Sequence, residues 1–329
     1  MSFYGRHITF GRSAERCTML TTARRTIRPT TVEFEICGDF DLTRCAAFPA
    51  DRSPAGRAAE DDPGTLRLAF PLDGTGEHVG ALVRQRAPDV VSVEVTATRE
   101  AVPAVAEQVR RMLSLDVDGT GFADAVAADP VMRTLRERHP GLRPVLFHSP
   151  YEAACWAVIC ARLRVAQAAL LKQRLAARLG CAVAVGGRTV ASFPSPEQLC
   201  ALDEQPGLSA QKRQRLVAIA GAAREGLLDA WSLRAMPVED ALERVRGLAG
   251  VGPFSAELIV VRGVGHPDVF PRHELRLHTV MAAVYGTGVV EELEDIAQRW
   301  QPFRSWGAFL LRSVGTSAIT GSRHGGEER

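Results

Sequence analysis

The feature that most constrains the fold of this chain is a glycine-rich break between two helical patterns, within Val238–Gly263. Before the break, apolar residues recur at the spacing of one helix face, at Ala241, Leu242, Val245 and Leu248. The break itself is Gly250–Pro253 (GVGP), and a second helical pattern begins at once. Glycine permits positive φ and leaves the backbone bare, and proline suits the first helical position because no intrahelical donor is lost there. The segment therefore predicts a helix, a very short hairpin and a second helix.

The predicted hairpin would present main-chain N–H groups to an anion. The first N–H groups of a helix have no acceptor inside the helix, and the helix dipole adds partial positive charge there. A DNA phosphate would satisfy these groups without regard to base sequence. An ordinary glycine-terminated connection between packed helices is the alternative. The length of the whole pattern favours phosphate binding, by Gly250, Val251, Gly252, Pro253, Phe254 and Ser255.

The N-terminal part of the sequence predicts an antiparallel sheet. Thr31–Ile36 alternates apolar and acidic residues with the period of a half-buried strand. Further β-rich runs, separated by Gly, Pro and Asp, are Leu66–Phe70, Val79–Val83 and Val90–Thr96. We therefore expect an antiparallel β-rich domain over residues 31–115. Residues 1–30 are expected to form a disordered basic lead, with a targeting peptide as the alternative, and residues 321–329 a disordered tail.

From residue 116 to residue 320 the sequence predicts an all-α domain. Helical spacing of the apolar residues sets in after Val102. Two helix starts are marked by a serine, a proline and an acid or amide three residues after the serine, at Ser149–Glu152 and Ser195–Gln198. The expected fold class is α+β, with the small sheet domain before the helices.

Composition excludes several classes of protein. Apolar residues make up 46% and charged residues 24% of the 329 residues, and no run reaches the roughly 18 apolar residues of a spanning helix. We therefore expect a cytoplasmic protein with no membrane partner. The net charge of +2 does not by itself indicate a nucleic-acid partner. Such a partner must be inferred from local clusters of basic residues. The seven cysteines form no CxxC pair, which argues against a metal site.

The hairpin and the segments around it resemble the helix-hairpin-helix DNA glycosylase superfamily, in particular its DNA-3-methyladenine glycosylase II group. The resemblance covers roughly residues 31–316, and further matching segments occur in the family's order: Leu115–Asp118 leading to Phe122, Asp129-Pro130, Ser149–Val158, Phe193–Pro196 and Trp300–Leu311. It implies a sheet domain followed by a helical domain that flips a damaged base out of duplex DNA and cleaves its N-glycosidic bond. The iron–sulfur cluster of some relatives needs a C-terminal cysteine set, and no cysteine lies beyond Cys200.

The resemblance assigns the catalytic carboxylate to Glu274. The family places an aspartate at the start of the helix after the hairpin, and this chain has Glu274 there, within Asp268–Leu277 (DVFPRHELRL). A fixed carboxylate stabilises the positive charge that builds on the sugar as the bond breaks. Glutamate keeps that charge but adds one methylene of reach. A solvated glutamate at a helix N-terminus is the alternative, Asp268 is the nearby rival carboxylate, and His273 is an exposed or proton-sensitive neighbour.

Two basic segments are candidates for DNA contact. Arg162 and Arg164 stand where the resemblance would place a polar run that faces the DNA, and Leu163 could fill the space left by a flipped base. Ser209–Arg224 is a basic run without an acid, and it includes Lys212. A solvated helix face explains either segment equally well. We predict DNA contacts from Arg162, Arg164 and Lys212.

The base pocket is expected to be aromatic, because a flipped base is held by stacking and cation–π contact. The candidate lining residues are Phe254, Trp156, Tyr151 and Leu258, the last of which stands where relatives can carry another aromatic ring. Core packing is the alternative for Trp156. Phe254 also occupies the position of the lysine with which the family's lyase branch forms a Schiff base. The resemblance therefore implies a monofunctional hydrolase.

The sequence therefore predicts a monofunctional DNA glycosylase of base excision repair, acting on damaged bases of the alkylated purine class. Its partner is double-stranded DNA with a damaged base, and we expect a monomer. No cofactor is expected, although the resemblance allows a monovalent cation at the hairpin. One alternative is a helix-hairpin-helix DNA-binding protein with a degenerate active site, to which Glu274 points. Another is a helical protein that uses the hairpin for protein contacts.

Overall fold

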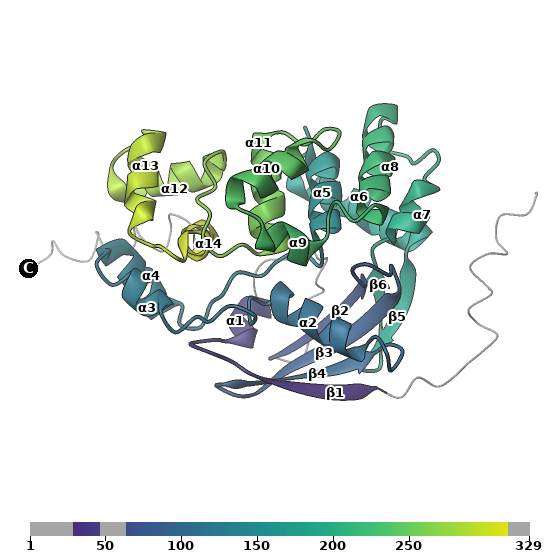
Figure 1. Cartoon of the computed structure of the whole chain (residues 1–329), viewed down its shortest axis with the longest axis horizontal. Helices are drawn as coiled ribbons and strands as arrows, with labels where there is room; N and C mark the ends of the chain where they lie inside the picture. The colour runs from purple at the N-terminus through teal and green to yellow at the C-terminus, as the bar shows by residue number, and fades with distance from the viewer. Residues whose placement is uncertain (1–28, 47–63, 315–329) are drawn as a thin grey trace, which may run out of the picture.

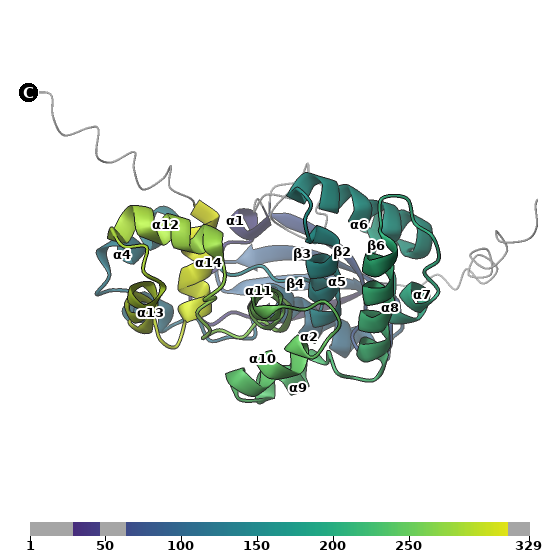
Figure 2. The same ribbon diagram turned by 90° about the horizontal axis from the view of Figure 1, so that it is seen from above.

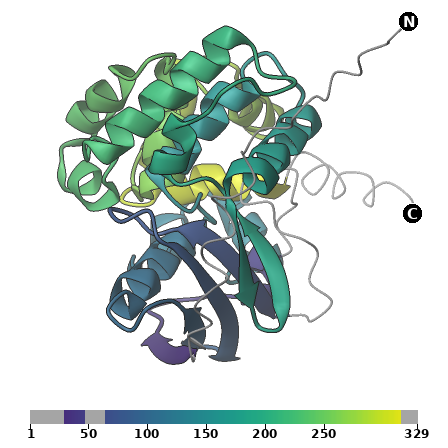
Figure 3. The same cartoon turned by 90° about the vertical axis from the view of Figure 1, so that its right-hand side faces the viewer.

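The computed structural model describes residues 29–46 and 64–314, which form a sheet covered on one side by helices (Figures 1 and 3). The predicted tail and all but the last two residues of the predicted lead lie outside the described residues. The elements are β1 Thr30–Glu35, α1 Leu42–Ala46, β2 Thr65–Pro71, β3 His78–Ala87, β4 Val90–Thr96, α2 Val102–Met112, α3 Phe122–Ala125, α4 Pro130–Arg138, α5 Pro150–Cys160, α6 Val165–Leu179, β5 Cys181–Val185, β6 Arg188–Ser192, α7 Pro196–Cys200, α8 Ala210–Arg224, α9 Ala230–Ala235, α10 Val238–Arg246, α11 Pro253–Leu258, the π-helix η2 Ile259–Val264, α12 Leu275–Tyr285, α13 Val290–Gln298 and α14 Arg304–Val314.

The N-terminal sheet is antiparallel, with strand order β1-β4-β3-β2. Its four strands match the four β-rich runs of the sequence, and α2 packs on one face to close a core of valines and leucines. Alternation places Val91, Val93 and Val95 of β4 inside this core. The predicted α+β fold is confirmed.

One element of the helical region was not predicted, a β-hairpin formed by β5 and β6. It lies against β2 and β3, where Val183 and Val185 pack on Ala69 and Leu82 (Figure 1). The expected all-α domain therefore contains two strands. Their short alternating pattern follows a long helix and was masked by the helical periodicity around it, since a run of five residues carries little periodic signal.

The helices form two further cores, which Figure 2 shows side by side above the sheet. One is built from α5 to α11 with η2, and the other from α4 with α12, α13 and α14. Asp129 is the N-cap of α4 and joins this helix to the rest of the second core. Its Oδ2 accepts hydrogen bonds from the hydroxyl of Tyr285 at 2.8 Å and from the indole N–H of Trp300 at 3.0 Å. Within the described ranges, no helix has the length and apolar character needed to cross a membrane.

Both helix starts marked in the sequence are formed as predicted. The hydroxyl of Ser149 accepts the N–H of Glu152 at 3.0 Å, and Ser195 caps α7 in the same way. The Ser195 cap is reciprocal, because the side chain of Gln198 accepts the N–H of Ser195 at 2.8 Å. Glu152 does not return the bond to Ser149. Its carboxylate turns inward instead.

Glu152 forms the centre of a buried charged cluster with His148 and Lys172. The Nδ1 of His148 lies 2.9 Å from one carboxylate oxygen, and the ammonium of Lys172 contacts the other. Burial alone would raise the pKa of the Glu152 carboxyl, but the attraction of His148 and Lys172 lowers it to about 2. The cluster joins α5 to α6, two helices that border the pocket described below.

Replacing Glu152 by Gln is expected to lower the free energy of unfolding by about 3 kcal/mol, because it leaves the Lys172 ammonium buried without its counter-charge. The pKa of the Glu152 carboxyl is lower in the folded protein than in the unfolded chain. Its contribution to the free energy of unfolding is therefore fully present above about pH 4.5 and is lost as the pH falls towards 2. Urea unfolding at pH 7 and pH 3 measures both effects. Exposed Glu197→Gln is the matched control and should change stability by less than about 0.5 kcal/mol. Equal stability of the two variants would contradict the prediction.

Candidate active site

The GVGP break joins two helices, as predicted. α11 begins directly after Gly252, which is its N-cap. Val251 is 8% exposed and packs in the helical core, so it anchors the turn. The first intrahelical bond runs from the N–H of Ala256 to the carbonyl of Gly252 at 2.9 Å. The N–H groups of Phe254 and Ser255 precede that bond and point out of the helix start.

The two glycines of the hairpin differ in conformation. Gly250 has a φ of +87°, in the left-handed region that favours glycine. A Cβ there would lie 2.5 Å from the Cδ of Arg215, whose side chain on α8 covers the turn. Gly252 has an extended backbone (φ −96°, ψ −177°), so it does not use the positive φ that glycine permits. A Cβ on Gly252 would meet no described atom within 4 Å, which leaves this side of the hairpin open to a ligand.

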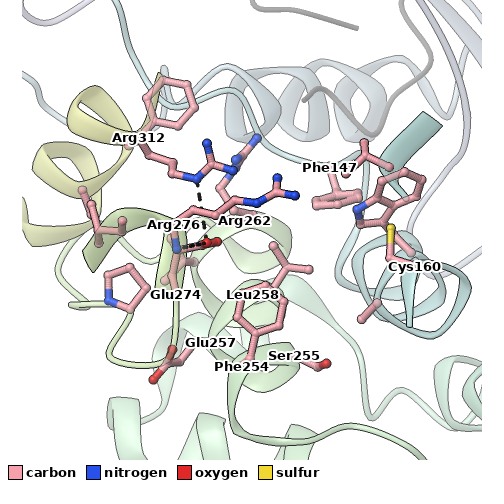
Figure 4. A pocket seen from close by; sticks show the side chains of 18 of the residues that line it. Phe147, Cys160, Phe254, Ser255, Glu257, Leu258, Arg262, Glu274, Arg276 and Arg312 are labelled. Carbon is pink, nitrogen blue, oxygen red and sulfur yellow. Dashed lines mark hydrogen bonds and ion pairs between the residues drawn. The ribbon is translucent and has the colours of Figure 1, made fainter. Parts of the chain in front are cut away.

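Glu274 lies at the N-cap of α12 and lines a pocket beside the hairpin. Its Oε1 accepts the N–H of Arg276 at 3.2 Å and lies 3.8 Å from the Nε of Arg312 on α14 (Figure 4). The side chain is 21% exposed, so the carboxylate reaches the pocket while partly shielded from water. Shielding strengthens its effect on a nearby positive charge, because the local dielectric is lower than in bulk water.

A buried glutamate that sequence reasoning did not single out fixes the loop before Glu274. Glu257 on α11 accepts the main-chain N–H of His273 at 2.8 Å, and its other oxygen lies 2.6 Å from the Nδ1 of His273. This pair ties the start of α12 to the second helix of the hairpin. It thereby sets the position of Glu274 relative to the hairpin. Its sequence signal was weak, since a glutamate within a helix is ordinary.

The rival carboxylate, Asp268, has a structural partner. Its Oδ1 accepts the Nε–H of Arg304 at 2.8 Å and the main-chain N–H of the same residue at 3.1 Å, so it caps α14. Asp268 is not among the described residues that line the pocket, whereas Glu274 and Glu257 are. The geometry therefore favours Glu274 as the carboxylate that reaches a bound group.

The pocket has a volume of about 560 Å³, within the range of small-molecule sites. Three of the four predicted base-pocket residues line it: Phe254, Trp156 and Leu258. Phe254 is 44% exposed and stands at the rim beside the hairpin. The turn between α5 and α6 also lines the pocket. Cys160 at the end of α5 and Phe147 before α5 face Glu274 across it (Figure 4). Burial raises the pKa of the Cys160 thiol to about 12, so this thiol stays neutral.

Three predicted site residues lie elsewhere. Tyr151 is buried, packs on Phe193 and donates its hydroxyl to the carbonyl of Pro194 at 3.1 Å, so it belongs to the core. Lys212 donates its ammonium to the last turn of α5 at 2.7 Å, and burial lowers its pKa. This bond holds the ammonium at α5, and the contact of Lys212 with DNA stays a prediction. Arg164 is exposed at the N-cap of α6 and is not among the described lining residues.

Arg162 does line the pocket, in an uncommon conformation. Its φ is +60°, which a non-glycine residue adopts at some cost in a tight turn. Leu163 lines the pocket next to it. The residues of this turn that we predicted to contact DNA therefore differ in position. Arg162 and Leu163 border the pocket, whereas Arg164 is the N-cap of α6.

Sequence reasoning missed a group of arginines in the pocket lining. Arg262 on η2, Arg276 on α12 and Arg312 on α14 gather around the carboxylate of Glu274 (Figure 4). The guanidinium of Arg262 also donates to the carbonyl of Val145 at 2.6 Å. Arg262 and Arg276 lie within the segments Val238–Gly263 and Asp268–Leu277, and Arg312 directly follows Trp300–Leu311, but their convergence depends on how three separate elements pack.

Several known proteins are similar to this chain in sequence or in fold. No family model matches the chain. The chain is 32% identical over 204 residues to a probable bifunctional transcriptional activator/DNA repair enzyme AlkA of Mycobacterium tuberculosis, a match that covers 60% of this chain and 40% of that protein. It is 24% identical over 217 residues to a DNA-3-methyladenine glycosylase of Bacillus subtilis, covering 64% of this chain and 72% of that protein.

A solved structure has the same fold over most of the chain. The 3-methyladenine DNA-glycosylase from Archaeoglobus fulgidus superposes with a TM-score of 0.73 at 23% identity, and the match covers 85% of this chain and 97% of that chain. By fold and by sequence, this chain is therefore similar to helix-hairpin-helix DNA glycosylases of the DNA-3-methyladenine glycosylase II type.

Proposed function

We propose that this protein is a monofunctional DNA glycosylase that flips a damaged base, of the alkylated purine class, out of duplex DNA and hydrolyses its N-glycosidic bond. The observation that carries this proposal is the placement of the Glu274 carboxylate in a pocket whose rim is the GVGP hairpin. The names of the similar proteins support the reaction class and the damaged-base class. Their partial coverage, with 40% of the first relative spanned, leaves this chain's own activity a proposal.

The chemistry assigns separate tasks to the two parts of the site. The outward N–H groups of Phe254 and Ser255 hold a phosphate of the DNA backbone. This contact sets how closely the duplex approaches the pocket. The flipped base enters between Phe254 and Trp156, whose rings offer stacking surfaces. As the bond from C1′ to the base breaks, Glu274 stabilises the positive charge on the sugar, and water adds to C1′.

The partner we propose is double-stranded DNA with a damaged base, bound by a monomer in the cytoplasm. Arg162 at the pocket edge and Arg215 over the hairpin supply positive charge near the predicted phosphate path. Arg164 is exposed and available to the same path.

A DNA-binding protein with a degenerate active site is the second candidate, favoured by the glutamate at the catalytic position and the Arg312 side chain 3.8 Å from it. Duplex oligonucleotides that each contain one damaged purine separate the two. Release of free base, with an abasic site left in the strand, supports the glycosylase. Tight, salt-dependent binding without release from any substrate supports the binding protein.

Borohydride is expected to trap no covalent adduct between this protein and DNA during turnover. Schiff-base chemistry needs a free amine at the sugar, and the sequence has only two lysines, Lys172 and Lys212. Lys172 is held by Glu152, and Lys212 donates to a main-chain carbonyl. Denaturing gel electrophoresis after borohydride treatment checks this, with a known lyase as the positive control. An adduct lost in Lys212→Gln would show that the protein is a lyase.

A further inference from the structure

The pocket that we assign to the flipped base carries an excess of positive charge. Of the described residues that line it, four are arginines and two are glutamates. Arg262, Arg276 and Arg312 lie around Glu274 (Figure 4), and Arg162 lines the same pocket. The net formal charge of these six side chains is +2. A site built only to attract a cation would be expected to show the reverse.

Each glutamate of the lining already has partners among the described residues. Glu257 is bound by the main chain and ring of His273. Glu274 accepts the N–H of Arg276 and lies close to Arg312. A base that already carries a positive charge would therefore meet guanidinium groups next to the one carboxylate it could approach. Like charges at short range in a partly shielded site disfavour each other.

Two aromatic rings of the lining already face protein cations. The guanidinium carbon of Arg262 lies 5.2 Å from the ring centre of Phe309, and the ammonium of Lys172 lies 6.0 Å from that of Trp156. Cation–π attraction acts over about 6 Å, so both rings are within range of a resident charge. The rings can still stack on a flat base. Their preference for a cationic base over an uncharged one is reduced.

We propose, on the basis of the glycosylase function above, that this pocket selects damaged bases that carry no formal charge when bound, and that Arg312, with Arg276, stabilises the negative charge such a base acquires as it leaves. Purines alkylated at an exocyclic or bridging position, such as 1,N6-ethenoadenine, belong to this class. Ring-methylated cations such as 7-methylguanine do not.

The bond between C1′ and the ring nitrogen of the base breaks, and its electron pair leaves with the base. A cationic base becomes neutral in this step, but an uncharged base becomes an anion and needs a positive group beside it. Water adds to C1′ as a hydroxyl group, which keeps one of its two protons, and the other proton ends on the departed base. Glu274 remains ionised and stabilises the sugar, while the guanidinium groups stabilise the departing base.

The test measures the enhancement of base release over spontaneous loss from the same DNA, so that the intrinsic lability of cationic lesions cancels. Duplexes with 1,N6-ethenoadenine and with 7-methylguanine are compared for wild type, Arg312→Gln and Arg272→Gln. Arg272 is the matched control because it pairs with Glu291 and Glu294 and is not among the described lining residues. Affinity for a duplex with an abasic-site analogue is measured in parallel.

We expect wild type to enhance ethenoadenine release at least about 10-fold more than 7-methylguanine release. Arg312→Gln should lower the ethenoadenine enhancement by about 10²-fold and leave the 7-methylguanine enhancement unchanged or raised, with abasic-site affinity within about 3-fold of wild type. Arg272→Gln should match wild type on both substrates.

Three results would overturn the proposal while the glycosylase function stands. They are a larger enhancement for 7-methylguanine, an equal loss on both substrates in Arg312→Gln, and a fall of abasic-site affinity beyond about 10-fold in that variant. The second would mean that Arg312 only positions Glu274, and the third that it binds a DNA phosphate. Release of no base from either duplex would instead refute the proposed function itself.

Discussion

Glu274→Gln is expected to lower the rate of base release from damaged duplex DNA by about 10²–10³-fold, with little change in DNA affinity. The substitution removes the negative charge at nearly constant shape, so the sugar loses its electrostatic stabilisation in the transition state. Binding depends on the hairpin, which the substitution does not touch. Single-turnover release kinetics, together with affinity for a duplex that carries an abasic-site analogue, separate the two effects.

Glu274→Asp shows whether the extra methylene matters. Aspartate withdraws the carboxylate from the pocket by one C–C bond and from the neighbourhood of Arg312. If the pocket is built around the longer side chain, this variant should also lose activity, though less than Glu274→Gln. Base release from Glu274→Gln at the wild-type rate would exclude Glu274 as the catalytic group. Asp268 would then need testing, despite its bond to Arg304.

Gly252→Glu is expected to weaken duplex binding by about 100-fold at low salt while leaving the fold intact. The backbone of Gly252 is extended, so any residue can adopt it, and no described atom lies within 4 Å of the added Cβ. The new side chain would occupy the space where we place the phosphate, and its charge would repel it. Fluorescence anisotropy with labelled duplex measures the affinity, and circular dichroism checks the fold.

Gly288→Glu is the matched control for this prediction. It adds the same charge at another glycine with open space around it, in the loop between α12 and α13. Its affinity should stay within about 3-fold of wild type. Equal affinity of Gly252→Glu and wild type would show that the hairpin is an ordinary connection between packed helices rather than a phosphate clamp.

Local features of the site were predictable because the residues that specify them are close in sequence. The helix, glycine turn and helix of Val238–Gly263 follow from periodicity and from the conformational range of glycine and proline. The caps at Ser149 and Ser195 follow from the bond between a hydroxyl and an N–H three residues on. Glu274 at the start of a helix was likewise readable, since only the order of neighbouring residues was needed.

Features that depend on packing between distant segments were not predictable. Tyr151 and Trp156 lie on the same helix, yet one faces the core and the other the pocket. Composition could not show that the Lys212 ammonium turns to a carbonyl of α5, 53 residues away in sequence. The β5–β6 hairpin is fixed by its apolar contacts with β2 and β3 rather than by its own pattern.

The sequence by itself determined most of the order of the elements and the hairpin, because short-range sterics and hydrogen bonding act along the chain. The proposal that Glu274 is the catalytic carboxylate came from the order of residues that the chain shares with the glycosylase family. Only the tertiary structure decided the chemistry of the pocket. Arg262, Arg276 and Arg312 come from η2, α12 and α14, and their charges add only because three helices place them around one carboxylate (Figure 4). Electrostatic energy depends on distance in space, which separation in sequence does not reveal.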